Sequence, residues 1–221
     1  MNIRMALQWR RSVRVASVVA FIAVGAQALQ VSVAGMNRAS DRRTISPIYW
    51  LSDEVGTSML VRSESGVSFT YHTSGLVPGQ AVTLWVVVFN NPAACATHPC
   101  TFNDMPNPDA QGDFLFGGGH VIGGTGTGNY GGHLAVGDVS GSGLAEIGGP
   151  ALGLLDPFTA EIHLALHSHG PAVPGRTLKA QLSSFLGGCE IFLGNDGIAD
   201  GPEDIPDEVG ECVTFQESIH Q

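Results

Sequence analysis

The chain has 221 residues, of which 43% are hydrophobic, and its formal net charge at pH 7 is −10. This length can bury a sizeable core, and one domain is the default expectation. The acidic balance excludes the positive surface that nucleic acids or anionic membranes attract, so we expect no nucleic-acid partner.

The first 28 residues have the composition of a secretory signal peptide. Four arginines precede an apolar run from Val15 to Val24, and Ala26-Gln27-Ala28 has the small residues that a signal peptidase recognises. The run is short for a mature anchor, and a retained N-terminal helix is the alternative. We expect a secreted or periplasmic protein with no membrane span after cleavage. The leader holds four of the ten basic residues and none of the twenty acidic ones, so the mature charge is −14.

Residues 29–47 are polar and are predicted to form a flexible N-terminal linker, followed by a single domain over residues 48–221. In that domain, turn residues separate short runs rich in β-branched and aromatic residues, and helical periodicity is scarce. The predicted strands are Val55–Arg62, Val67–Thr73, Ala81–Phe89, Phe114–Ile122, Tyr130–Val136, Ala160–Ser168 and Cys212–Ile219. The pattern favours an all-β, antiparallel two-sheet β-sandwich, with a partly closed β-barrel as the alternative. Ala81–Phe89 is almost continuously apolar, which predicts a central strand covered on both faces.

The four cysteines are expected to form disulfides, because export exposes them to an oxidising compartment. Neighbour pairing joins Cys95 with Cys100 and Cys189 with Cys212. The second bridge would contribute roughly 3 kcal/mol of stability. The alternative is a thiolate metal site built from Cys95, His98 and Cys100.

A glycine-rich segment, residues 119–133, contains a literal G-x-G-x-x-G at Gly126, Gly128 and Gly131. No helix is predicted after it and no βαβ unit surrounds it, so a dinucleotide site is excluded. We expect a hairpin or loop that brings His120 and His133 towards the end of a neighbouring strand.

The stretch Ala160–Gly170 carries three histidines at alternate or near-alternate positions of a predicted strand. Strand side chains alternate between faces, so one face would carry Glu161, His163, Ala165, His167 and His169, and the core-facing side Ile162, Leu164 and Leu166. The last two histidines lie about 7 Å apart at the backbone, which suits one copper or zinc ion held by converging imidazoles. Further ligands would come from His163, His120, His133 or His72. The alternative is a polar strand face with incidental histidines.

An acidic loop spans residues 190–211 and contains a candidate calcium site. Its ligands would be Asp196, Asp200, Asp204 and Asp207. Ile198 occupies a ligand position of the EF-hand pattern, and a glutamate is missing at its end, so the segment is not an EF-hand. Asp-Gly-Ile-x-Asp does resemble one calcium-binding aspartate repeat of extracellular proteins. A solvated acidic loop is the alternative.

The run His167-Ser168-His169-Gly170-Pro171-Ala172, together with GLVPG at residues 75–79, resembles the chordin-type (CHRD) domain of secreted proteins. Two longer stretches, LVPGQAVTLWVVVFNNPAAC and GPALGLLDPFTAEIHLALHSHGPAVPG, resemble exported bacterial proteins without assigned activity. The resemblance covers much of residues 76–189 and implies a secreted β-sandwich with its histidine pair near a sheet edge. It implies no catalytic role, and the acidic and glycine-rich segments depart from the chordin pattern.

The sequence therefore predicts a secreted, disulfide-stabilised binding or structural module of unassigned activity, with a metal site on its histidine strand. The alternative is a copper- or zinc-dependent enzyme that uses the same histidines. An enzyme of this kind requires at least three imidazoles that converge on one point of a concave site.

Overall fold

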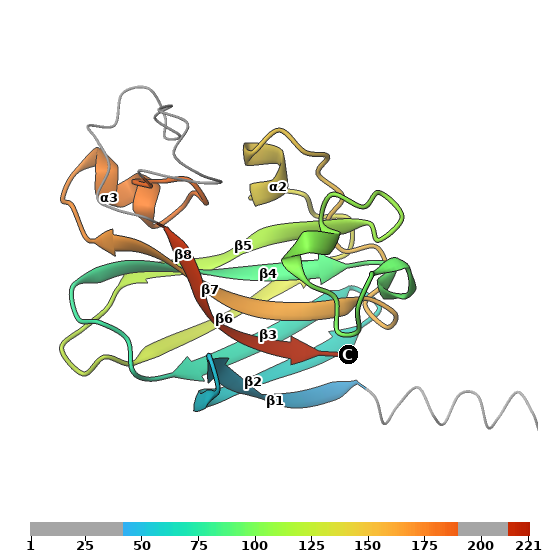
Figure 1. The fold of residues 1–221 in the computed structure, drawn as a ribbon, viewed down its shortest axis with the longest axis horizontal. Helices are drawn as coiled ribbons and strands as arrows, with labels where there is room; N and C mark the ends of the chain where they lie inside the picture. The colour runs from blue at the N-terminus through green and yellow to red at the C-terminus, as the bar shows by residue number, and fades with distance from the viewer. Residues whose placement is uncertain (1–41, 190–211) are drawn as a thin grey trace, which may run out of the picture. The chain divides into compact units, whose positions relative to one another are not determined.

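The computed structural model describes residues 42–189 and 212–221. Eight strands dominate this part of the chain (Figure 1). They are β1 (Arg43–Trp50), β2 (Asp53–Ser63), β3 (Gly66–Thr73), β4 (Gln80–Phe89), β5 (Gly112–Val121), β6 (Gly128–Ala135), β7 (Glu161–Pro171) and β8 (Val213–His220). The helical segments are short: η1 (Pro92–Ala94), η2 (Phe102–Asp104), α2 (Gly143–Glu146) and α3 (Arg176–Gln181). The all-β prediction is confirmed, and each of the seven predicted strands overlaps an observed one.

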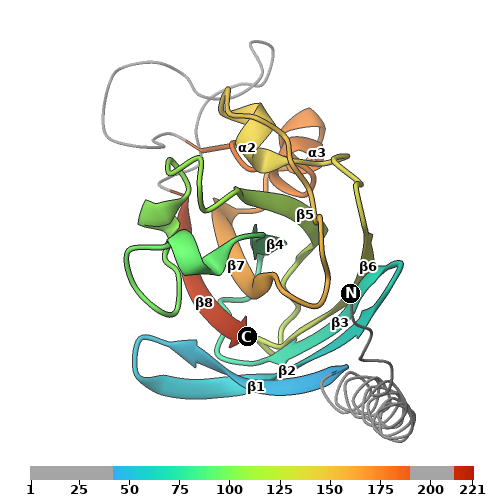
Figure 2. The ribbon, with the colours of Figure 1, turned by 90° about the vertical axis from the view of Figure 1, so that its right-hand side faces the viewer.

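The strands form one antiparallel sheet in the order β5-β4-β7-β8-β1-β2-β3-β6. The end strands β5 and β6 follow one another in sequence and lie close together, so the sheet curls into a nearly closed barrel (Figure 2). Within the confirmed all-β class, this single curled sheet corresponds to the partly closed barrel that the sequence left as the alternative.

Strand β1 corrects the predicted boundary of the linker. Residues 43–47, which we expected in the linker, pair with β2 in a register that runs from Arg43 opposite Val61 to Trp50 opposite Asp53. Only Ile48 of this strand is fully buried, so its sequence lacks the apolar alternation by which the other strands were recognised.

Three predictions fall outside the described residues: the signal peptide at 1–28, residues 29–41 of the linker, and the candidate calcium loop at 190–211. Among the residues that are described, no helix combines the length and the hydrophobicity needed to cross a membrane.

Strands β4 and β7 separate two apolar layers, as the uninterrupted hydrophobic sequence of β4 predicted. The barrel interior receives the side chains of one face of each strand, which include Leu84 and Val86 from β4 and, as predicted, Ile162, Leu164 and Leu166 from β7. The opposite face of β4 carries Trp85, Val87 and Phe89 into an outer layer. That layer is covered by the connection between β4 and β5, by α2 and by the chain after α3. The functional candidates lie in this outer layer.

A buried histidine near the end of the chain, His220, joins three strands. Its Nδ1 lies 2.8 Å from Thr44 Oγ1 of β1, and its Nε2 lies 2.9 Å from Ser58 Oγ of β2. Burial, together with the nearby charges of Arg62 and His163, lowers the pKa of His220 to about 4. The side chain is therefore an uncharged structural link at neutral pH.

Candidate functional site

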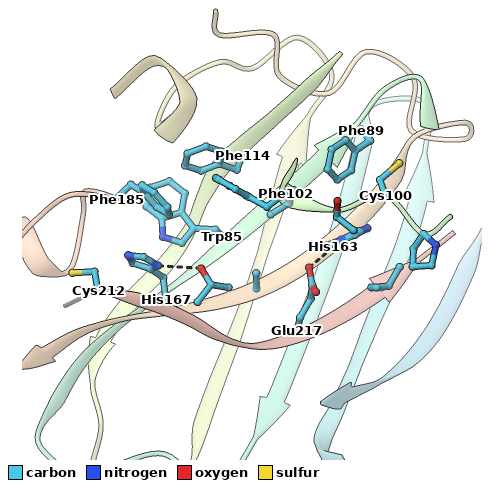
Figure 3. A pocket seen from close by; sticks show the side chains of 16 residues that line it. Trp85, Phe89, Cys100, Phe102, Phe114, His163, His167, Phe185, Cys212 and Glu217 are labelled. Carbon is cyan, nitrogen blue, oxygen red and sulfur yellow. Dashed lines mark hydrogen bonds and ion pairs between the residues drawn. The ribbon is translucent and has the colours of Figure 1, made fainter. Parts of the chain in front are cut away.

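A cavity of about 470 Å³, which we call the aromatic pocket, opens over the outer face of β4, β7 and β8 (Figure 3). Its walls are mostly apolar, with a histidine towards each end. The lining includes Trp85, Phe102, Phe114, His163, His167 and Glu217. The volume falls within the range of about 300–1,000 Å³ that small-molecule sites occupy.

Aromatic rings meet edge to face in the inner part of the pocket. The ring of Trp85 lies 5.6 Å from that of Phe114 and 5.2 Å from that of Phe185, in both cases in T-shaped geometry. Such pairs add about 0.5–1.5 kcal/mol each beyond the burial of their area, so this wall is rigid. Phe102, by contrast, is 47% exposed and lies at the pocket rim.

One end of the pocket carries a buried histidine between two carboxylates. His163 Nε2 lies 2.8 Å from Glu161 Oε1, and His163 Nδ1 lies 2.8 Å from Glu217 Oε1. Burial alone would lower the pKa of His163, but the hydrogen bonds and charges of Glu217 and Glu161 outweigh it and raise that pKa. Two glutamates share one imidazole here, so acidic side chains outnumber basic ones at this end of the pocket.

Glu161 also fixes the covering loop to the sheet. Its Oε1 accepts a hydrogen bond from the backbone N–H of Cys100 at 2.6 Å, and its Oε2 accepts one from Gln221 Nε2 at 3.2 Å. Because Cys100 is disulfide-bonded to Cys95, the whole short loop is held over the start of β7.

The other end of the pocket carries His167, which is uncharged and incompletely hydrogen-bonded. Its Nδ1 lies 3.1 Å from Thr214 Oγ1, and its ring stacks on Phe185 at 4.4 Å. Its Nε2 is buried and has no hydrogen-bond partner among the described residues. Burial and the neighbouring His169 lower the pKa of His167 to about 3, while the Phe185 carbonyl acts in the opposite direction. A buried polar atom without a partner is uncommon in proteins, and a water molecule or an ion bound to it is one explanation.

His169 lies beside His167, with ring centroids 4.9 Å apart, but both of its nitrogens have partners. Nδ1 lies 2.8 Å from the carbonyl of Gly187, and because a carbonyl only accepts, Nδ1 must carry the proton. Nε2 therefore accepts from Thr83 Oγ1 at 2.8 Å, and Thr83 in turn accepts from Trp85 Nε1 at 2.8 Å. Burial lowers the pKa of His169 to about 4, which keeps it neutral.

This chain of bonds predicts that Thr83→Val destabilises the domain. Valine has nearly the shape of threonine but offers no hydroxyl, so Trp85 Nε1 and His169 Nε2 would both be buried without a partner. We expect a loss of about 2–3 kcal/mol in the free energy of unfolding, measured by urea denaturation. Thr57→Val, at an exposed position of β2, is the control and should cost less than about 1 kcal/mol. Equal effects of the two substitutions would contradict the assigned bonds.

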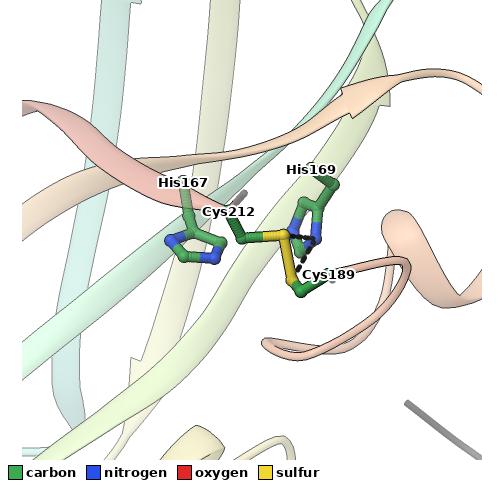
Figure 4. A group of neighbouring side chains, drawn as sticks. All are labelled: His167, His169, Cys189 and Cys212. Carbon is green, nitrogen blue, oxygen red and sulfur yellow. Dashed lines mark hydrogen bonds between the residues drawn. A yellow bond between two sulfur atoms is a disulfide. The ribbon is translucent and has the colours of Figure 1, made fainter. Parts of the chain in front are cut away.

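The structure brings two cysteines, and no third imidazole, to the histidine pair. One nitrogen each of His167 and His169 and the sulfur atoms of Cys189 and Cys212 all lie within 4.8 Å of one another (Figure 4). The two cysteines form a disulfide, as neighbour pairing predicted, and so do Cys95 and Cys100. The alternative thiolate site with His98 is therefore excluded for the bonded state.

The other predicted ligands lie apart from this group. His72 is exposed on β3 and bonds to Asn129, and His133 is exposed on β6 and bonds to Ser68. His120 stacks on Tyr130 at 4.4 Å, with its pKa lowered by burial. Among the described residues, the structure does not bring these side chains or His163 together with His167 and His169. The strands that carry them lie elsewhere in the sheet order, and His163 is held by its two carboxylates.

The position of the histidine pair also differs from what the chordin resemblance implies. Strand β7 lies between β4 and β8, well inside the sheet order, whereas the resemblance implies a position near an edge. The pair is near the end of its strand but is covered on both faces.

Several pocket residues have no signal in the sequence. Trp85 belongs to a strand that was recognised, but the pocket-facing side of that strand could not be identified from a continuous apolar run. Phe102, Phe185 and Glu217 come from segments far apart in sequence, and only the folded sheet and its covering loops bring them together.

Comparison of the chain with models of known protein families, with curated proteins and with solved structures finds no match. The likeness to chordin-type domains and to exported bacterial proteins thus stays a prediction.

Proposed function

We propose that this chain is an exported binding module whose aromatic pocket takes a small, largely apolar molecule that carries no negative charge. The observation that carries the proposal is the pocket itself: rigid aromatic walls with a few polar groups placed at its ends. Sites of this composition are the default binding sites of folded proteins.

The charges around the pocket determine the class of ligand. Two glutamates, Glu217 and Glu161, contact the single imidazole of His163, so the excess of acidic groups at this end disfavours an anionic ligand. His167 lines the other end and is neutral, so it adds no charge there. A neutral molecule with one polar group, or an apolar ammonium ion directed at Glu217, satisfies both ends.

The fluorescence of Trp85 gives a direct test. In the mature chain with Trp50→Phe, Trp85 is the remaining tryptophan, because Trp9 lies in the predicted leader. We expect phenylpropanol and phenylpropylammonium to change the emission of Trp85 saturably, and phenylpropionate to bind at least tenfold more weakly. Preference for phenylpropionate, or no saturable change with any of the three, would refute the proposed ligand class.

Phe102→Ala tests the location of binding. The side chain is half exposed at the rim, so its removal costs the fold little but takes apolar contact from the ligand, about 1 kcal/mol or fivefold in Kd. Leu51→Ala removes a fully exposed apolar side chain elsewhere and is the matched control. Unchanged Kd in Phe102→Ala would show that the probes bind outside the pocket.

The alternative of a copper or zinc enzyme gains no specific support, since the described residues do not present the three converging imidazoles that it requires.

A further inference from the structure

The group formed by His167, His169, Cys189 and Cys212 has the composition of a structural zinc site, and its ligand atoms are already gathered. All four lie within 4.8 Å of one another, and His169 Nδ1 is 3.7 Å from each of the two sulfur atoms. In a tetrahedral Cys₂His₂ site, with Zn–S of about 2.3 Å and Zn–N of about 2.0 Å, ligand atoms lie roughly 3.3–3.8 Å apart. Small side-chain movements thus separate this group from a complete coordination shell.

Whether a metal can bind there depends on the charge of the two cysteines. His167, His169 and Cys189 are almost completely buried. With the disulfide intact, a divalent cation would bring two uncompensated charges into this environment, which is strongly unfavourable. Two thiolates carry two negative charges, which balance the two positive charges of the cation. They also supply the soft ligands that zinc prefers.

We infer that reduction of the Cys189–Cys212 disulfide converts this group into a zinc site, with His167, His169, Cys189 and Cys212 as its four ligands. A dithiol reductant supplies two electrons and two protons, so that the sulfur–sulfur bond becomes two thiols and the dithiol becomes a disulfide. Binding of Zn²⁺ then releases the two thiol protons to solvent. The inference goes beyond the proposed ligand of the aromatic pocket and does not depend on it.

The surroundings of both histidines suit this change. The Nε2 atom of His167 has no partner to lose among the described residues. His169 must move its proton from Nδ1 to Nε2, where the hydroxyl oxygen of Thr83 lies at 2.8 Å and can accept it as a hydrogen bond. Metal-bound histidines are commonly oriented by such a bond from the other ring nitrogen.

Cobalt(II) is the probe for this site, because its tetrahedral complexes absorb visible light and its thiolate bonds give a near-ultraviolet charge-transfer band. We expect the mature chain with intact disulfides to show neither feature. After reduction with tris(carboxyethyl)phosphine, we expect one equivalent of Co²⁺ to bind with both features, and Zn²⁺ to displace it.

Three variants locate the ligands. A Cys95→Ser, Cys100→Ser double variant removes the other disulfide and should keep the spectrum, whereas Cys189→Ser should weaken Co²⁺ binding at least a hundredfold and lower the charge-transfer band. His167→Gln should weaken binding at least tenfold.

An octahedral spectrum alone, an unchanged spectrum in Cys189→Ser, or tight tetrahedral binding by the oxidised chain would overturn the inference. So would a reduced chain that loses its β-sheet circular dichroism and does not regain it with Co²⁺ or Zn²⁺. The phenylpropanol titration of the oxidised, metal-free chain is independent of all these results.

Discussion

Between pH 7 and pH 5 the domain is expected to lose roughly 5 kcal/mol of its free energy of unfolding, because three buried histidines resist protonation in the folded state. They are His167, His169 and His220, with pKa values of about 3, 4 and 4. In the unfolded chain each regains the ordinary value of about 6.5. The unfolded state therefore binds more protons over this interval, and stability falls as the pH falls below about 6.5.

The size of the effect follows from linkage. Each histidine contributes about 1.4 kcal/mol per pH unit once the pH is well below 6.5 and above its folded pKa, or nearly 2 kcal/mol by pH 5. His163 acts in the opposite sense, because its pKa is raised by Glu217 and Glu161. The stabilisation from His163 is fully present below about 6.5 and is lost as the pH rises through its folded pKa, so it offsets only a small part of the loss.

Urea denaturation at pH 7 and pH 5 measures this difference directly. His220→Gln keeps a hydrogen-bonding side chain near Ser58 but removes one titrating group, so the loss between the two pH values should shrink by about 2 kcal/mol. His72→Gln, at an exposed position, is the control and should leave the loss unchanged. Equal stability of the parent chain at both pH values would show that the buried histidines do not remain neutral.

Strands were predictable wherever apolar residues alternate or form a continuous run. A strand without either pattern was missed. β4 was recognised because burial on both faces requires a nearly unbroken apolar sequence. β7 was recognised because apolar residues alternate with polar ones along it. β1 was missed because its pairing with β2, and not burial, stabilises it. One curled sheet forms instead of two because β8 pairs with both β7 and β1. Local sequence does not indicate which strands pair in this way.

The candidate site was predictable only in part, for a related physical reason. The shared face of His167 and His169 follows from strand periodicity, and their proximity was correctly inferred. The residues that lie next to this pair could not be predicted, because they depend on which loops cover the outer face of the sheet. Cys189 and Cys212, which the sequence assigned solely to a structural bridge, lie at the histidine pair. Of the histidines chosen as partners, His72, His120 and His133 lie on other strands, and His163 is bonded to two glutamates.

The second large effect is expected from Asp113→Ala, which should lower the free energy of unfolding by about 3–5 kcal/mol. Asp113 is completely buried at the start of β5, and its carboxylate accepts four hydrogen bonds. The donors are the backbone N–H groups of Phe114, Leu152 and Gly153 and the hydroxyl of Ser142, all at 2.8–2.9 Å. Alanine would leave these buried donors without their acceptor.

Asp113→Asn distinguishes the lost hydrogen bonds from the lost volume. Asparagine fills the same space, but its amide nitrogen donates. It would therefore face either the Leu152 and Gly153 N–H groups or the Phe114 N–H with a second donor. We therefore expect Asp113→Asn to lose at least half as much stability as Asp113→Ala in urea denaturation, whereas Asp53→Asn, at an exposed end of β2, should change it by less than about 0.5 kcal/mol. If Asp113→Asn left the free energy of unfolding unchanged, the hydrogen bonds of the carboxylate would not stabilise the loop between β6 and β7. Packing against Phe114 would then hold that loop in place.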